Sequence, residues 1–146
     1  MPRDHHSDDE IRSLLSTVKT IAMLGASPNP ARPSNRVLRF LLSQGYTVYP
    51  VNPGHAGGQI HGATVYGTLA DVPSPIDMVD VFRNSSFVAG VVNEALALTP
   101  KPKAIWTQLD VYDDEAAAKA EAAGVTMVMD RCPAIEIPRL GVPKRA

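Results

Sequence analysis

The chain has 146 residues, of which 45% are hydrophobic and 20% are charged, and its formal net charge is −1. This composition is typical of one globular domain, and the charge argues against a nucleic-acid partner or an anionic membrane. No apolar stretch approaches the ~18–20 residues of a spanning helix, and the N-terminus lacks the apolar centre of a signal peptide. A single cysteine, Cys132, excludes an internal disulfide framework. We therefore expect one cytoplasmic domain over residues 1–146.

Hydrophobic periodicity predicts strands and helices in alternation along the chain. Residues 1–7 are polar and are expected to be a loose tail, after which 8–17 has the pattern of a helix that Ser7 and Glu10 cap. Compact apolar runs predict strands at 20–25, 46–51, 77–82, 103–108 and 125–130. Further helices are predicted at 34–45, with Ser34 as N-cap, at 85–98, and at 113–124. Residues 131–146 are expected to be irregular apart from a helical turn.

This alternation predicts an α/β fold with a mainly parallel sheet of about five strands and helices on both faces. In such sheets, ligands bind at the carboxyl ends of the strands, near the point where the strand order reverses. The residues that follow the strands are therefore the candidate site. They lie at 25–34, 51–58, 82–86, 107–110 and 130–132.

The first of these segments, GASPNPARPS at 25–34, has the features of an anion site. Its glycine permits a tight turn, its first serine brings a hydroxyl and a free N–H, and the start of the next helix suits a phosphate. Two arginines can add charge-assisted hydrogen bonds. The alternative is a proline-stiffened loop with solvent-facing arginines. The candidate anion-binding residues are Gly25, Ala26, Ser27, Arg32, Ser34, Asn35 and Arg36.

The same loop is not a dinucleotide fingerprint. The pattern G-x-G-x-x-G would need glycines at positions 27 and 30, which are serine and proline. A P-loop is excluded because G-K-[ST] is missing. The second strand is followed by PGHAGG, without the acidic residue that usually holds the ribose of NAD. NAD is therefore disfavoured, and a ligand with an apolar or neutral ring remains compatible with these prolines and glycines.

The later segments contribute aromatic, cationic and amide side chains. Phe82 could present an aromatic edge and Arg83 a cation, with a surface ion pair as the alternative for the arginine. One of the serines at 85–86 is expected to cap the following helix. Trp106 is interpreted as a core residue rather than a ligand platform, and Gln108 could bind either a polar ligand group or the backbone.

Catalytic constellations are scarce. His5 and His6 lie in the polar tail and are expected to be solvated. His55 and His61 share one glycine-rich loop without a third ligand at convincing spacing, so no metal site is assigned. Cys132 follows a strand and an arginine and could have a lowered pKa at the crevice. The alternative, which we prefer, is a small buried cysteine.

Six segments together carry a family resemblance. They are GAS at 25–27, RPS at 32–34, GYTVYPVNP at 45–53, DMVDVFRNS at 77–85, IWTQL at 105–109 and MDRCPAIEIPRL at 129–140. In this combination the chain resembles the CoA-binding domain family related to the N-terminal domain of the succinyl-CoA synthetase α subunit, above all its small stand-alone bacterial members. The resemblance covers roughly residues 8–141 and implies a Rossmann-like three-layer domain.

The resemblance implies coenzyme A or an acyl-CoA as the ligand. The turn after the first strand and the helix that begins at Ser34 would hold the phosphates. The residues after the next two strands would line the adenine side and close over the ligand: Val51, Asn52 and Pro53, then Phe82 and Arg83. The chain departs from its relatives at two positions. It has Gly54 where relatives often carry a lysine, and Asp110, where they often have glycine, would repel an anionic ligand if it faced the crevice.

The main hypothesis is therefore binding of CoA or an acyl-CoA without catalysis, since by the resemblance the synthetase's catalytic histidine lies in a separate domain. One alternative is an enzyme, either NAD(P)-linked or thiol-based through Cys132. The other is an interaction protein with a vestigial nucleotide site. We expect a small-molecule ligand and no nucleic-acid or membrane partner. A homodimer or an unidentified protein partner stays open, because the edge strands of a small sheet need cover.

Overall fold

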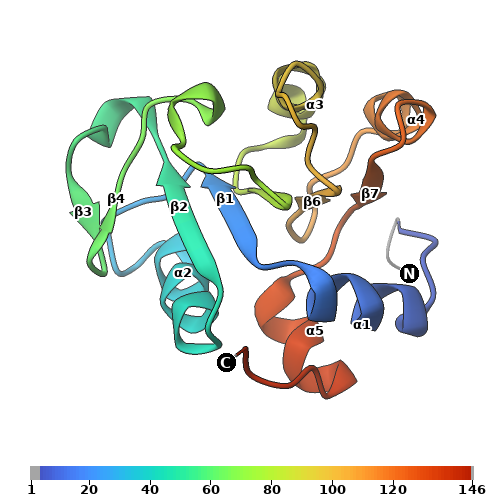
Figure 1. Cartoon of the computed structure of the whole chain (residues 1–146), viewed down its shortest axis with the longest axis horizontal. Coiled ribbons are helices and arrows are strands. Elements are labelled where there is room, and N and C mark those ends of the chain that lie inside the picture. Colours follow the sequence, from blue (N-terminus) through green and yellow to red (C-terminus); the bar gives the residue numbers. More distant parts are fainter. Residues whose placement is uncertain (1–3, 146) are drawn as a thin grey trace.

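The computed structural model describes residues 4–145, and its main feature is a five-stranded sheet with helices on both faces (Figure 1). The strands lie in the order β2-β1-β5-β6-β7, and every neighbouring pair is parallel. This confirms the predicted α/β, Rossmann-like fold. The strands are β1 (Thr20–Leu24), β2 (Thr47–Val51), β5 (Met78–Val81), β6 (Ala104–Thr107) and β7 (Thr126–Val128).

Successive residues of β1 point to opposite faces of the sheet and join two separate apolar cores. Ile21 and Met23 pack in the core with α1, α2 and α5, whereas Ala22 and Leu24 pack in the core with α3 and α4 (Figure 1). None of the helices formed by residues 4–145 combines the length and apolar character needed to cross a membrane. The helices are α1 (Asp8–Thr17), α2 (Pro33–Ser43), α3 (Val88–Leu96), α4 (Asp114–Ala122) and α5 (Pro133–Leu140).

A small hairpin that the sequence analysis did not predict lies beside β2. Its strands, β3 (Gln59–Ile60) and β4 (Ala63–Thr64), have two residues each, too few to show a periodic pattern. The chain then forms an isolated parallel bridge between Val51 and Tyr66. The Tyr66 N–H donates to the Pro50 carbonyl over 2.9 Å. The hairpin and this bridge therefore cover part of the outer edge of β2, which would otherwise expose unpaired backbone groups.

Helix α5 corrects the prediction of an irregular C-terminal segment. Pro133 occupies the first helical position, where a missing N–H costs nothing. Pro138 lies within the last turns, and Gly141 ends the helix in the left-handed conformation, with φ 67°. Burial of Ile137 and Leu140 in the core then stabilises an eight-residue helix.

Two predicted helix caps are also wrong. Arg32, not Ser34, is the N-cap of α2, because Pro33 with its preset φ begins the helix one residue earlier. No serine caps α3. Instead, the Asn84 side chain accepts a hydrogen bond from the Ser86 N–H over 3.1 Å, at the start of a short 3₁₀ turn that leads into α3. The predicted capping box of α1, by contrast, is confirmed.

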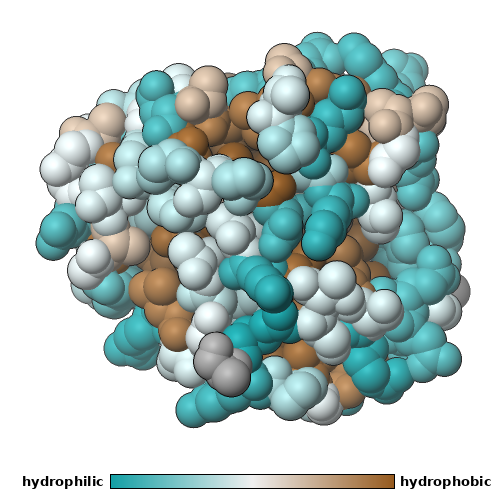
Figure 2. All heavy atoms as spheres, in the orientation of Figure 1, coloured by the Kyte–Doolittle hydropathy of each residue, from teal (hydrophilic) through white to brown (hydrophobic). Residues whose placement is uncertain are grey.

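Polar side chains cover most of the face shown in Figure 2, and apolar side chains show between them as smaller patches. The large apolar residues that remain exposed are Phe87, Leu109 and Ile135. These residues follow β5, β6 and β7, respectively, so all three belong to segments at the carboxyl edge of the sheet.

Candidate functional site

A cleft of about 770 Å³ opens at the carboxyl ends of the strands. Each of the five strands contributes at least one residue from the segment that follows it. The strand order reverses between β1 and β5, which is where parallel sheets of this kind bind ligands. The lining residues are Gly25, Ser27, Arg32, Pro33, Ser34, Val37, Asn52, His55, Phe82, Arg83, Asn84, Gln108, Leu109, Val111 and Cys132.

The floor of the cleft is formed where β1 and β5 end side by side. The Gly25 N–H donates to the Val51 carbonyl over 3.0 Å, and the Phe82 N–H donates to the Leu24 carbonyl over 2.8 Å. Gly25 has φ 80°, and a Cβ there would lie 2.9 Å from the carbonyl carbon of Phe82 and closer still to its oxygen. Only glycine fits this turn, which brings the backbone of the next loop to the strand ends.

Amide and hydroxyl side chains hold the loop between β1 and α2 in place. Asn52 donates through Nδ2 to the Ala26 carbonyl over 2.8 Å, and Asn35 donates through Nδ2 to the Ser27 carbonyl over 3.0 Å. The Ser27 N–H donates to the Ser34 hydroxyl over 3.1 Å, so the prediction that this N–H is free is wrong. These bonds fix the loop before any ligand arrives, which lowers the entropic cost of binding.

The structure places the predicted site residues in two groups. Those that line the cleft are Gly25, Ser27, Arg32, Ser34, Asn52, Phe82 and Arg83. Those that do not line it are Ala26, Asn35, Arg36, Val51 and Pro53. Ala26, Asn35 and Val51 are buried and support the cleft from beneath. The Arg36 guanidinium instead donates to the carbonyl oxygens of Pro30 and Ala31 in the preceding loop. The ligand contacts of the first group stay a prediction.

The cleft combines positive charge with an absence of acidic lining residues. Arg32 and Arg83 contribute guanidinium groups, and none of the described residues that line the cleft is acidic. The Arg83 Cζ atom lies 4.0 Å from the centre of the Phe87 ring, so this arginine stacks on an aromatic face. Asp110 does not line the cleft. Its φ of 65° lies in the left-handed region, which glycine adopts most easily. The electrostatics therefore favour an anionic ligand.

Comparison with known proteins agrees with this geometry. A family model described as CoA binding domain matches residues 19–138. The chain belongs to the CoA-binding domain family. This confirms the resemblance carried by the sequence motifs.

Some relatives of this CoA-binding domain are about as long as this chain, and others are much longer. The chain is 35% identical to YneT of Bacillus subtilis (strain 168) over 126 residues, which are 86% of this chain and 90% of YneT. A solved structure from Pyrococcus horikoshii OT3 is 38% identical, has a TM-score of 0.88 and is matched over 96% of both chains. The alpha subunit of an ADP-forming acetate–CoA ligase from Pyrococcus furiosus is 30% identical over 80 residues, which are 52% of this chain but 17% of that subunit.

Gln108 lines the cleft of this CoA-binding domain and carries a buried hydrogen-bond acceptor. Its side chain is nine-tenths buried, and its Oε1 atom has no hydrogen-bond partner among the described residues. A buried acceptor without a partner costs free energy, roughly 1–3 kcal/mol, until a donor reaches it. From the sequence, Gln108 was expected to bind either a polar ligand group or the backbone. Its Oε1 atom bonds to neither among the described residues and is almost fully enclosed by its surroundings.

Cys132 is a buried cysteine that also lies at the cleft. The thiol is buried, with 8% of the residue exposed, as the preferred interpretation holds. The residue nevertheless lines the cleft of the CoA-binding domain and is the N-cap of α5.

The cleft is also lined by residues that were not among the predicted site residues: Pro33, Val37, His55, Asn84, Leu109 and Val111. The sequence offers only one signal for most of them, their position within or just after a segment that follows a strand.

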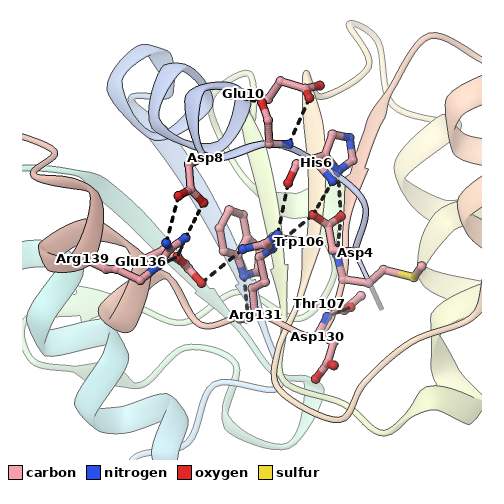
Figure 3. Close-up of polar contacts among 12 residues, drawn as sticks. Asp4, His6, Asp8, Glu10, Trp106, Thr107, Asp130, Arg131, Glu136 and Arg139 are labelled. Atoms are coloured by element: carbon pink, nitrogen blue, oxygen red, sulfur yellow. Dashed lines mark hydrogen bonds and ion pairs between the residues drawn. The ribbon is translucent and has the colours of Figure 1, made fainter. Parts of the chain in front are cut away.

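A buried ionic network lies behind Cys132 and ties the N-terminal segment to the loop between β7 and α5 (Figure 3). The Arg131 Nε atom lies 3.1 Å from Asp4 Oδ2, and its Nη1 lies 3.4 Å from Glu136 Oε1. Arg131 also donates to the His6 carbonyl over 3.2 Å, and Trp106 donates through Nε1 to the Arg131 carbonyl. Trp106 is fully buried, which confirms it as a core residue.

This network corrects the prediction of a loose tail for Asp4 and His6, whereas His5 is exposed as expected. Asp4 is buried, and the His6 side chain is only 7% exposed. Residues 1–3 lie outside the described residues. The sequence could not show the tail's partners, because they are 127 residues away along the chain.

Asp80 is a buried acid in the middle of the sheet. Its neighbours in register are Met23 of β1 and Trp106 of β6. It is fully buried, and neither carboxyl oxygen has a hydrogen-bond partner among the described residues. Burial raises the pKa of the Asp80 carboxyl well above its usual value, because the charged form would lose its hydration. Asp80 does not line the cleft.

Proposed function

We propose that this chain binds coenzyme A or an acyl-CoA in the cleft at the carboxyl ends of its strands, without catalysing a reaction itself. The observation that carries the proposal is the acid-free lining with Arg32 and Arg83, next to the first turn of α2. A helix N-terminus and guanidinium groups are favourable surroundings for phosphates. CoA carries three phosphate groups, a diphosphate and a 3′-phosphate.

Other features of the cleft match the rest of the CoA molecule. The volume of about 770 Å³ lies within the ~300–1,000 Å³ usual for small-molecule sites. CoA has a long pantetheine arm. Leu109 and Val111 offer apolar surface for the arm. Family membership and the similarity to a CoA ligase subunit support the same ligand.

Melting temperatures measured with CoA, dephospho-CoA and NAD⁺ would test the proposal. A ligand at ~100 times its Kd adds ~2.7 kcal/mol to the free energy of unfolding, enough to raise the Tm by several degrees. We expect a rise with CoA and a smaller one with dephospho-CoA, which lacks the 3′-phosphate. A rise with NAD⁺ alone would favour an NAD-linked enzyme, and no rise with any of them would favour a vestigial site.

Arg32→Ala should weaken CoA binding about tenfold or more in isothermal titration, because a charge-assisted hydrogen bond to phosphate contributes roughly 1.5–3 kcal/mol. Arg36→Ala is the matched control. It removes the same charge from the same helix, but its guanidinium is bonded to loop carbonyls and does not line the cleft. We expect the control to change the affinity less than about twofold by long-range charge alone. Equal losses in both variants would contradict a phosphate contact at Arg32.

A second candidate function is thiol–disulfide exchange, favoured by the position of Cys132 in the cleft lining. The Cys132 thiolate would attack one sulfur of CoA disulfide, forming a protein–CoA disulfide and releasing the other CoA as its thiolate. Intact-mass spectrometry after incubation with CoA disulfide should then show one CoA adduct that dithiothreitol removes. The adduct must be missing in Cys132→Ser. Failure of the parent chain to form any adduct would leave binding as the function.

A further inference from the structure

Two histidines and a glutamate gather at the edge of the sheet formed by β7, away from the ligand cleft. His5 and His6 precede α1, and Glu121 lies in the last turn of α4. One potential ligand atom from each lies within 4.8 Å of the other two. We propose that these three side chains form a binding site for a divalent transition-metal ion of the Zn²⁺ type. The proposal is independent of CoA, because the hollow at this place and the CoA cleft share no lining residue.

The distances suit a metal ion with little rearrangement. Zn–N and Zn–O bonds of about 2.0–2.1 Å in a tetrahedral site place the ligand atoms about 3.3 Å apart. His6 Nε2 and Glu121 Oε2 are already 3.6 Å apart. His5 is exposed, and its ring stacks on that of His6 with the ring centres 4.5 Å apart. Because this ring is exposed, it can rotate to bring one of its nitrogens to the same ion.

Asp4 prepares His6 for metal binding. The His6 Nδ1 atom lies 2.6 Å from Asp4 Oδ1, and the Asp4 carboxylate is in turn held by Arg131 Nε at 3.1 Å (Figure 3). With the proton on Nδ1, the lone pair of Nε2 is free and faces Glu121. A carboxylate that orients a histidine in this way is the usual outer partner of a zinc-binding imidazole.

The surroundings leave room for the remaining coordination position. The three ligands border a hollow of about 690 Å³ between the N-terminal segment, α1, α4 and the start of β7. Two imidazoles and one carboxylate with a water as the fourth ligand is an established zinc ligand set. An ion here would connect the segment before α1 with α4, across the edge strand β7. Helices α1 and α4 pack on opposite faces of the sheet. Its expected effect is therefore to stabilise the fold at this edge.

The alternative is an imidazolium form of His6 that pairs with both carboxylates and needs no ion. Isothermal titration of the tag-free chain with Zn²⁺, without CoA, distinguishes the two. We expect one Zn²⁺ per chain, with an affinity that falls at least tenfold in His5→Ala and in Glu121→Gln. Both residues are exposed, so these variants should fold. His6→Ala would be a poorer test, because it also removes the bond to Asp4.

Matched controls make the result specific. Glu115→Gln removes an exposed carboxylate from the same helix, and His55→Ala removes an exposed histidine elsewhere. Neither control should change the Zn²⁺ affinity. Saturating Zn²⁺ should raise the Tm of the parent chain by about 5 °C and leave the His5→Ala chain unchanged. The proposal is overturned if the parent binds no stoichiometric Zn²⁺, or if His5→Ala and Glu121→Gln bind it as tightly as the controls.

Discussion

Gly25→Ala should lower the free energy of unfolding by about 2–5 kcal/mol and abolish ligand binding in the cleft. The left-handed backbone at this position costs an L-residue about 1–2 kcal/mol. The added Cβ would also collide with the Phe82 carbonyl, and overpacking of this kind costs about 1–3 kcal/mol. That carbonyl cannot move freely, because the same residue's N–H is bonded to Leu24. Relief of the collision must therefore separate the ends of β1 and β5, where the cleft has its floor.

Gly124→Ala is the control that separates the cost of the left-handed backbone from the cost of the collision. Gly124 also has a positive φ, 85°, but a Cβ there would meet nothing within 4 Å. This variant should lose only the conformational part, about 1–2 kcal/mol, and should bind CoA like the parent. Urea unfolding of both variants, with CoA titrations at equal protein concentration, gives the comparison. If Gly25→Ala loses no more stability than Gly124→Ala, the close approach of β1 and β5 does not constrain the site.

Asp80→Leu should make the protein more stable at neutral pH. Leucine has the same branched shape as aspartate, and it replaces two buried oxygens that have no partner among the described residues. The folded-state pKa of Asp80 is raised, so the folded state holds its proton while the unfolded chain releases it. This contribution to stability is fully present below the unfolded pKa of about 3.9 and is lost as the pH rises through the folded pKa.

The measurement is the free energy of unfolding of parent and variant from pH 3.5 upward. The difference should grow in favour of Asp80→Leu by about 1.4 kcal/mol per pH unit between the unfolded and the folded pKa, and then level off. Asp80→Asn is the control. It removes the titration, but it keeps a buried polar group, so its pH profile should run parallel to that of Asp80→Leu without the full gain in stability. Parallel pH profiles for parent and Asp80→Leu would mean that Asp80 titrates normally.

The sheet could be predicted from the sequence because each of its strands is a short apolar run that a glycine, a proline or a polar residue bounds. Predictions of individual helices and strands were wrong where the local sequence signals were weak or misleading. Residues 131–146 were expected to be irregular apart from a helical turn, although Pro133 is favourable at a first helical position. The β3–β4 hairpin has too few residues to show alternation. Tertiary packing on the core, which no local pattern encodes, decides both cases.

The site was predictable to the extent that it follows from topology. Parallel strands bring the segments after them to one edge, which is why Gly25, Arg32 and Arg83 could be named as neighbours. The direction in which each side chain points could not be predicted in this way. Asn35 and Arg36 are consecutive in α2, yet one supports the loop and the other bonds to carbonyls of the preceding loop. The unpaired oxygen of Gln108 depends on packing from several segments and has no sequence signature.

The contact between Asp4 and Arg131 has a consequence for the order of folding. It joins residues 127 positions apart, so it can form only after nearly the whole chain has been gathered. We expect it to form late in folding, because the entropic cost of closing so long a loop must be met before the contact can stabilise the chain. A contact that is absent from the folding transition state slows unfolding and leaves the folding rate unchanged. We therefore expect the buried N-terminal segment to set the lifetime of the folded protein rather than the speed of its formation.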